Sequence, residues 1–288
     1  MPDDPRRIDR EEPAVAHLDH QAITAVEARG LDPHRLAREQ PGDRGRLEPA
    51  LGEPLLLAAH GDAVLIVRAN GLDTPWGRAD VAALARAGAD AVLLPKVESP
   101  GMVREAVDAL AGAPAALALW CMLETPRGIL NAAAIAAASP RITALVMGTS
   151  DLTKELHARH TPDRLPLLTS LELCVLAARA AGVAALDGVH LDLDDDAGFE
   201  AACRQAVALG FDGKTLIHPK QIAAANELFG PTAHDVEWAR RVIAAHAEAA
   251  ARGQGVALLD GRLIENLHVE DARRAVALAE AIETLARR

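Results

Sequence analysis

The chain has 288 residues, of which 50% are hydrophobic, and this is enough for one large barrel domain or two ordinary domains. A net charge of −11 without any Lys/Arg-rich block argues against a nucleic-acid partner, and three cysteines without C-x-x-C spacing argue against a disulfide framework. No apolar run reaches the ~20 residues of a membrane span and no secretory core follows the charged N-terminus, so we expect a cytoplasmic protein.

The first 60 residues differ in composition from the rest of the chain. They are rich in Arg, Asp, Glu and Pro, and their first apolar run is Pro54–Ala59. His17–Glu27 and Pro33–Glu39 are compatible with helices, whereas no β-branched run predicts a strand. We therefore expect this segment to be helical or irregular.

From about residue 61, short apolar runs alternate with longer alanine-rich helical stretches. Continuous apolar strands that are each followed by a helix predict parallel strands buried on both faces. The expected strands are Val64–Val67, Ala91–Leu94, Leu117–Leu123, Ala144–Met147, Ala184–Leu191 and Thr215–Ile217, and the helices that follow them start near Ala79, Pro100, Ile129, Leu152, Ala197 and Lys220.

A closed barrel and an open doubly wound sheet both produce this alternation, and the polar residues distinguish them. Polar residues fall at the C-terminal ends of many successive strands, as on the active face of a (β/α)8 barrel, whereas an open sheet concentrates them at one switch point. We therefore predict an α/β fold of the (β/α)8 TIM-barrel type, incomplete or atypically closed at its N-terminus. These polar residues are Arg68, Asn70, Lys96, Glu98, Glu124, Asp151, Asp187, Asp192 and His218.

The C-terminal part of the chain is expected to be mainly helical, over Ala233–Arg252 and Val269–Arg287. Between these helices, Gly253–Arg262 indicates an irregular loop with a short strand. This tail lies beyond the last unit of a barrel and is a candidate lid or inter-subunit arm. The expected organisation is an atypical segment over 1–60, barrel units over 61–232 and a helical lid or arm over 233–288.

Two acidic residues, Glu124 and Asp151, end adjacent expected strands beside glycine-containing turns. Two such carboxylates can share one Mg²⁺, which prefers a couple of carboxylates together with waters and substrate oxygens. A metal held there can chelate an α-keto acid and stabilise developing enolate charge. The alternative is that either acid is a helix cap or a solvated loop residue.

Basic residues also follow the strands. Arg68 suits bidentate binding of a carboxylate or polarisation of a thioester oxygen, or else a structural salt bridge. Lys96 could form a Schiff base, but a metal pair makes that redundant. An electrostatic or hydrogen-bonding role beside the metal is therefore preferred, with a purely structural role as the alternative. Arg127 lies at a helix start whose free N–H groups can receive anionic oxygens.

The acidic run after the fifth strand could be mistaken for a second metal site. His190 stands close to Asp192–Asp196 in the sequence. Acidic residues also favour the positive end of a helix macrodipole, and we expect Asp194–Asp196 to begin a helix.

Six segments together resemble the citrate lyase β-subunit/malyl-CoA lyase family of the HpcH/HpaI aldolase superfamily, in order and in spacing. The resemblance extends from about Gly61 to Arg288. The segments are Val67–Gly77, Leu93–Ser99, Met122–Gly128, Gly148–Leu152, Ala185–Gly188 and Gly210–Pro219.

The resemblance implies roles for individual residues. Glu124 and Asp151 match the family's Mg²⁺ ligands, and Arg68 matches a substrate-binding, catalytic arginine. Arg127 would belong to the substrate pocket. Further along the chain, Lys214 and His218 resemble a coenzyme A-proximal loop, although His218 could equally be structural.

Two departures from the family pattern stand out. Glu265 occupies the position of an Asp that reaches into a neighbouring subunit as the proton-transfer group, and one extra methylene displaces that carboxylate. Family members also open with a strand that ends in Pro-Gly and a strand that ends in Leu-Glu-Asp, and residues 1–60 contain neither. Both departures put full activity in question.

The expected function is Mg²⁺-dependent carbon–carbon cleavage, or by reversal formation, of a citryl-, malyl- or citramalyl-thioester. The products are an acetyl-thioester and an α-keto acid, the acyl carrier is coenzyme A or a carrier protein, and the enzyme is a homo-oligomer, a trimer or hexamer. Two alternatives stay open: a metal-dependent 4-hydroxy-2-oxoacid aldolase that acts without coenzyme A, and a catalytically impaired, non-enzymatic homologue.

Overall fold

The computed structural model describes residues 64–286, so the expectations for residues 1–60 lie outside the described part of the chain. The chain divides into two compact units, whose described parts are residues 64–229 and residues 230–286.

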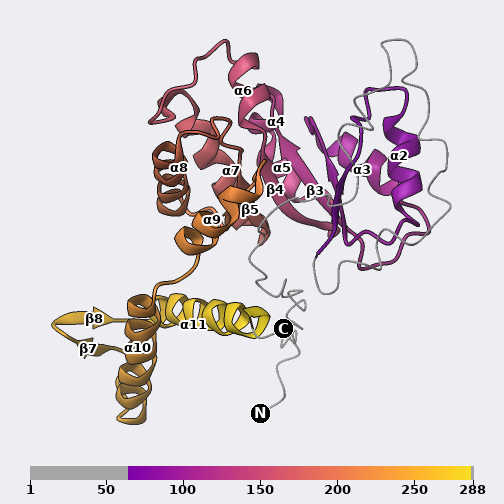
Figure 1. The fold of residues 1–288 in the computed structure, drawn as a ribbon. Coiled ribbons are helices and arrows are strands. Elements are labelled where there is room, and N and C mark those ends of the chain that lie inside the picture. The colour runs from indigo at the N-terminus through magenta and orange to yellow at the C-terminus, as the bar shows by residue number, and fades with distance from the viewer. Residues whose placement is uncertain (1–63, 287–288) are drawn as a thin grey trace, which may run out of the picture. The chain divides into compact units, whose positions relative to one another are not determined.

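The first unit contains a parallel sheet of six strands that follow one another in chain order (Figure 1). Every neighbouring pair is parallel, as the sequence predicted. The strand order has no reversal, so this sheet lacks the switch point of a doubly wound fold. The strands are β1 (Ile66–Arg68), β2 (Ala91–Leu94), β3 (Ala118–Leu123), β4 (Ile142–Met147), β5 (Ala184–Asp187) and β6 (Gly213–Lys214).

Helices alternate with these strands along the chain. Two helices, instead of the one expected, connect β3 with β4, and two also connect β4 with β5. The longest of these four helices starts at Leu168. The helices are α2 (Gly77–Leu84), α3 (Pro100–Ala109), α4 (Pro126–Leu130), α5 (Ala132–Ala136), α6 (Thr149–Glu155), α7 (Leu168–Ala181), α8 (Asp196–Leu209) and α9 (Ile222–Phe229), with 3₁₀ turns η2 (Leu165–Leu167) and η3 (Pro219–Gln221).

Local sequence explains where several helices begin and end. The side chains of Ser99 and Thr125 accept backbone N–H groups at the starts of α3 and α4, and a proline follows each as the first helical residue. Helices α7 and α8 end at Gly182 and Gly210, whose positive φ angles of 68° and 96° suit glycine. Short-range chemistry therefore determines where α3 and α4 begin and where α7 and α8 end.

Alternate strand residues face two different layers. On the outer face, residues such as Leu94, Leu123 and Leu145 pack with helix residues in the largest hydrophobic cluster. The opposite, inner face carries a smaller cluster made of strand residues alone. Its buried members are Ile66, Ala91, Leu93, Trp120, Ala144, Val146 and Leu186.

The sixth strand differs from its prediction. The apolar run Thr215–Ile217 was expected to be the strand, but β6 is Gly213–Lys214, which pairs with Leu186 and Asp187 of β5. Leu216 instead packs with Phe199 and Ala225 under α8 and α9. The expectation was wrong because an apolar run can be buried against helices as well as within a sheet.

The second unit consists of α10 (Ala233–Ala251), a hairpin of β7 (Ala257–Leu259) and β8 (Arg262–Ile264), and α11 (Asn266–Ala286). The sequence predicted both helices but only one short strand between them. The hairpin turn, Asp260-Gly261, has positive φ angles of 50° and 76°, which is the geometry that Asp-Gly favours in two-residue hairpins. Apolar residues of α10, β7, β8 and α11 form a core of their own.

Candidate active site

Two predicted site residues, Arg68 and Glu124, and the nearby Gly148 continue the inner face of the sheet. Arg68, Glu124 and Gly148 each follow an inner-face residue by two positions, at or just beyond the C-terminal ends of β1, β3 and β4. Because side chains on a strand alternate with a period of two, we expect these positions to share the inner face. Three separate segments therefore bring polar groups to one end of the sheet.

Glu124 is at the centre of this group. It is buried, and its Oε1 accepts the backbone N–H of Lys96 at 2.9 Å. Burial raises the pKa of Glu124, and the charge of Asp151 raises it further; the Lys96 hydrogen bond and the charges of Lys96 and Arg68 lower it. These influences show that the four predicted residues are within electrostatic reach of one another.

Gly148 allows Asp151 to come near Glu124. A Cβ atom at Gly148 would lie 2.4 Å from Cβ and 2.6 Å from Oε2 of Glu124, distances that no side chain tolerates. Gly148 precedes α6, and Asp151 lies half-buried in the first turn of that helix. The absence of a side chain at Gly148 thus places the start of α6 against Glu124.

Lys96 has an unusual backbone conformation in the β2–α3 loop. Its φ angle is 50°, which costs energy in a residue other than glycine. This conformation directs the Lys96 N–H to Glu124, while the Lys96 side chain is exposed. The backbone and the side-chain charge of Lys96 therefore both act on Glu124.

Arg127 lies on the first turn of α4, three residues after Glu124 along the chain. Its guanidinium is 3.7 Å from the Glu98 carboxylate, and 75% of its side chain is exposed. The Thr125 hydroxyl accepts the Gly128 N–H at 3.1 Å and so starts the helix that carries Arg127. Such an exposed guanidinium next to the strand end is available to an anionic ligand.

Lys214 and His218 are placed differently from each other. Lys214 was expected in a loop, but it lies in β6 with only 1% of its side chain exposed, and its ammonium contacts the Asp187 carboxylate at 2.6 Å. His218 is exposed, and its Nδ1 accepts the Lys220 N–H, which starts η3. His218 is thus accessible to a ligand, and Lys214 is not.

Glu265 belongs to the second unit. It precedes α11, its side chain is exposed, and its backbone N–H donates to Nδ1 of His268 at 3.0 Å. Its assignment as a proton-transfer group from a neighbouring subunit stays a prediction.

The acidic run after β5 begins a helix, as expected. Asp195 accepts the Gly198 N–H and caps α8, which starts at Asp196. His190 packs edge-on against Phe199 with ring centroids 5.9 Å apart. Within residues 64–286, no cluster of three or more His, Cys, Asp or Glu side chains is arranged to hold a metal.

Glu124 and Asp151 nevertheless fit Mg²⁺. Two carboxylates are the protein contribution that this ion commonly takes, because it keeps several waters and substrate oxygens as its other ligands. The hydrogen bond from Lys96 occupies Oε1 of Glu124, and Oε2 faces the Gly148 side, where α6 brings Asp151. The chemistry of these two donors therefore fits a magnesium ion.

One largely buried charged side chain, that of Arg164, was not among the predicted site residues. Arg164 donates to both carboxylate oxygens of Asp187, at 2.9 and 2.7 Å, beside the ammonium of Lys214. Arg164 stands in the connection between α6 and η2, with a φ angle of 53°. No local motif marks it, so only the tertiary structure reveals this contact.

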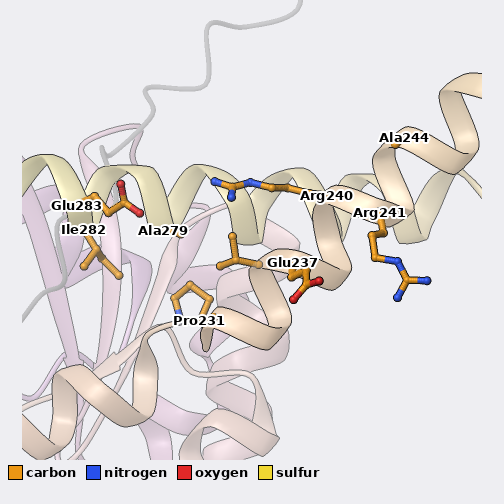
Figure 2. A pocket seen from close by; sticks show the side chains of 10 residues that line it. Pro231, Glu237, Arg240, Arg241, Ala244, Ala279, Ile282 and Glu283 are labelled. Atoms are coloured by element: carbon orange, nitrogen blue, oxygen red, sulfur yellow. The ribbon is translucent and has the colours of Figure 1, made fainter.

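Within residues 64–286, a hollow is found in the second unit. It has a volume of about 580 Å³ and lies between the start of α10 and the end of α11 (Figure 2). Val236 and Ile282 line it together with Arg240. None of the predicted site residues contributes to it.

Among residues 64–286, no helix is long and apolar enough to cross a membrane.

Comparison with known proteins gives consistent matches. The model of the family described as HpcH/HpaI aldolase/citrate lyase matches residues 43–219, which is more than half of the chain and starts before Gly61. A (3S)-malyl-CoA thioesterase of Cereibacter sphaeroides is 51% identical over 232 residues, 81% of this chain and 80% of the relative. A citrate lyase subunit beta of Leuconostoc mesenteroides is 36% identical over 80% of this chain and 78% of the relative.

Solved structures agree with the predicted fold. The CitE protein of Mycobacterium tuberculosis, in complex with magnesium, acetoacetate and coenzyme A, has a TM-score of 0.63 and 32% identity over 75% of this chain and 78% of that chain. A citrate lyase of Burkholderia xenovorans has a TM-score of 0.66 at 17% identity, over 84% and 82% of the two chains, and supports the fold alone. The prediction of a TIM-barrel type of fold with a helical C-terminal part is confirmed; the described strands form a curled half-barrel.

Proposed function

This chain belongs to the HpcH/HpaI aldolase/citrate lyase family, and on that premise we propose that it is a Mg²⁺-dependent carbon–carbon lyase. Its substrate is a 3-hydroxyacyl-thioester of the citryl-, malyl- or citramalyl-CoA kind, and its products are an acetyl-thioester and an α-keto acid. The observation that carries the proposal is the approach of Asp151 to the buried Glu124, which Gly148 permits. The names of the relatives favour coenzyme A over a carrier protein as the acyl carrier.

In this proposal each residue has a defined task. Glu124 and Asp151 hold Mg²⁺, which supplies positive charge for the oxygens of the keto acid. Arg68 binds the substrate carboxylate or thioester oxygen and stabilises charge that develops there. Lys96 holds Glu124 in place through its backbone N–H, and Arg127 and His218 contact the anionic parts of the substrate.

The reaction requires two proton movements. The 3-hydroxyl group loses its proton, the carbon–carbon bond breaks as the carbonyl of the keto acid forms, and the released acetyl-thioester carbon takes up a proton. We assign the proton transfer to Glu265 of a neighbouring subunit, so the enzyme acts as a homo-oligomer. The segments 61–232 and 233–288 then serve as the barrel and as the arm that carries Glu265.

Thioester hydrolysis is the second candidate, and one observation favours it. The relative that is 51% identical is named a (3S)-malyl-CoA thioesterase, a higher identity than that of the citrate lyase subunits. Hydrolysis breaks the bond between the thioester carbonyl carbon and sulfur, with water supplying the hydroxyl group and the thiol taking a proton. The same metal and the same Arg68 would orient the substrate.

One product assay distinguishes these functions. The purified chain is incubated with Mg²⁺ and malyl-, citramalyl- or citryl-CoA, and the CoA species are separated by chromatography. Carbon–carbon cleavage gives acetyl-CoA and the keto acid in equal amounts, whereas hydrolysis gives free CoA and the hydroxy acid. Absence of turnover on all three thioesters, with turnover of a 4-hydroxy-2-oxoacid instead, would contradict the proposal in favour of a CoA-independent aldolase.

A further inference from the structure

Three charged side chains form a buried network at the C-terminal ends of β5 and β6. Asp187 is fully buried, and Arg164 and Lys214 both donate to its carboxylate. The Lys214 ammonium also donates to the carbonyl of Gly188. Gln205 of α8 accepts from Nε of Arg164 at 2.7 Å. The network thus joins two strands, one helix and the connection that follows α6.

This network lies on the outer face of the sheet, away from the face that carries Glu124. Ala185 packs in the outer cluster and Leu186 in the inner one, so strand alternation places Asp187 on the outer face. Lys214 is the β-sheet partner of Asp187 and shares its face. A role for Lys214 in direct substrate binding does not fit this orientation.

Two connections lead from the network to α6. Arg164 belongs to the segment that leaves α6, and its left-handed backbone conformation is held by the contacts of its side chain. Gly188, whose carbonyl binds Lys214, lies against the first residue of α6: a Cβ at Gly188 would be 2.3 Å from the Thr149 hydroxyl. The first residue of α6 and the segment that follows this helix therefore both lead to the same buried charges.

Buried charges rarely add net stability, because the cost of removing them from water offsets their attraction. In proteins generally, apolar residues of similar volume often replace a buried ion pair without loss of stability. A network of one carboxylate and two cations is better explained by the specific geometry that its hydrogen bonds impose.

We propose that Arg164, Asp187 and Lys214 are positioning residues that hold the start of α6, and with it Asp151, beside Glu124. The proposal deepens the proposed function, because the role of Asp151 as a metal ligand rests on that function. The network acts on Asp151 through the backbone of α6. Removal of groups that hydrogen-bond metal ligands directly changes metal affinity about 10–100-fold, and the lower end of that range sets the scale of the effect expected here.

Lys214→Met is the main test. It removes one cation and leaves Arg164 and Asp187 as a pair without net charge. The chain should therefore fold, and circular dichroism checks this. Hydrogen–deuterium exchange of residues 149–155 is measured without metal, and Mg²⁺ affinity is measured by calorimetry. We expect faster exchange in α6 and an affinity about 10-fold or more below that of the parent.

Arg179→Met is the matched control. Arg179 makes a bidentate ion pair with Asp212, at 2.8 Å to each oxygen, and Asp212 bonds the Ala185 N–H at the opposite end of β5. This variant also loses an arginine–carboxylate pair next to β5 and β6. Its exchange in α6 and its Mg²⁺ affinity should stay within about twofold of the parent.

A second variant tests the same proposal if Lys214→Met does not fold. Gln205→Leu removes the acceptor of Arg164 Nε but leaves the buried charges paired. It should shift both measurements in the same direction by a smaller factor.

Unchanged exchange in α6 in the folded Lys214→Met protein, or in Gln205→Leu when the former does not fold, would overturn the positioning role. If the parent binds no Mg²⁺, the metal assignment of the proposed function fails instead, and the exchange measurement alone decides on the network.

Discussion

At the scale of single residues, Glu124 combines two properties that are rarely found together. It is buried, which disfavours a charge, and it lies within reach of a second acid, Asp151, which disfavours it further. The Lys96 N–H and the charges of Lys96 and Arg68 offset part of this cost. A divalent cation would relieve the remaining repulsion, which is why this pair is the most informative target for mutation.

Glu124→Gln and Asp151→Asn should each abolish Mg²⁺-dependent turnover and leave the fold intact. A neutral amide keeps the shape of the side chain but lacks the charge that a hard cation requires. Turnover is measured with the thioester panel, and folding is checked by circular dichroism. Glu105→Gln, on the exposed side of α3, is the control and should retain parental activity. Normal turnover in either site variant would contradict the assignment of Glu124 and Asp151 as Mg²⁺ ligands.

Arg68→Lys should be impaired by about tenfold or more, although the charge is kept. A planar guanidinium can make two parallel hydrogen bonds to a carboxylate, whereas an ammonium acts as a point charge. Loss of one charge-assisted hydrogen bond is enough for an effect of about this size. Steady-state kinetics with saturating Mg²⁺ would measure it. Activity within about twofold of the parent would show that Arg68 is peripheral.

At the scale of elements, the turn between β4 and α6 decides how close two acids can come. Gly148 has a φ angle of −99°, which any residue can adopt, so its requirement for glycine is purely steric. The obstacle is the side chain of Glu124, which is itself held by the Lys96 N–H. The turn and the β2–α3 loop therefore act on the same carboxylate from two directions.

Gly148→Ala tests this steric argument directly. Its Cβ would collide with Glu124, so we expect loss of Mg²⁺ binding and of activity, measured by calorimetry and by the product assay. Gly101→Ala is the matched control, because its Cβ meets only the Ser99 hydroxyl at 3.4 Å and alanine favours the helix. Parental Mg²⁺ affinity in Gly148→Ala would contradict the close approach of α6 to Glu124.

Helix α10 has a complete capping box at its start. The Thr232 hydroxyl accepts the Asp235 N–H at 3.1 Å, and the Asp235 carboxylate accepts the Thr232 N–H at 3.0 Å. The Thr232 hydroxyl and backbone lower the pKa of Asp235, so its carboxylate stays ionised to a lower pH than that of an ordinary aspartate. The cap defines where the C-terminal helical unit begins.

Thr232→Ala should weaken the first turn of α10 by about 1 kcal/mol, the usual effect of removing such a cap. Amide exchange in that turn should become about fivefold faster, as mass spectrometry can measure. Thr284→Ala serves as the control: its hydroxyl only bonds the Glu280 carbonyl within α11, and alanine is the better helix former. Equal exchange in Thr232→Ala and the parent would show that the cap is dispensable.

At the scale of the whole molecule, the core is built from aliphatic and small residues, since aromatic residues are only 2% of the chain. The three cysteines are part of that core. Cys121 and Cys174 pack in the largest cluster, and Cys203 packs with Phe199 under α9. Each cysteine packs in the core as a small apolar side chain does, and none forms a disulfide.

The native protein should therefore contain no reactive thiol. Burial raises the pKa of Cys121 and Cys174 to about 12 and that of Cys203 to about 11. Only the thiolate reacts with Ellman's reagent, so we expect no labelling at pH 8 in the native state and labelling of all three residues after unfolding. Rapid labelling of the native protein at any of them would show that the core around that residue opens.

Much of the fold followed from short-range patterns. The apolar runs located β1 to β5 within a few residues, although the run Ala184–Leu191 ended earlier than expected, at Asp187. The prediction was wrong where an apolar segment could pack either within the sheet or against helices, as in Thr215–Ile217. Helix α7 was missed although it is long, because the region between β4 and β5 was treated as one helical stretch.

The sequence by itself determined the order of the six parallel strands and the grouping of Glu124, Asp151, Arg68 and Lys96, because adjacent parallel strands end at the same edge of a sheet. Only the tertiary structure decided on which face a residue lies and what surrounds it. Lys214 shows the difference: its motif suggested a ligand-binding loop, but the pairing of β6 with β5 buries it beside Asp187. The partner in that contact, Arg164, is 23 residues from Asp187 along the chain. Periodicity and capping are local properties that a sequence displays, whereas burial and ion pairing depend on segments that meet only after folding.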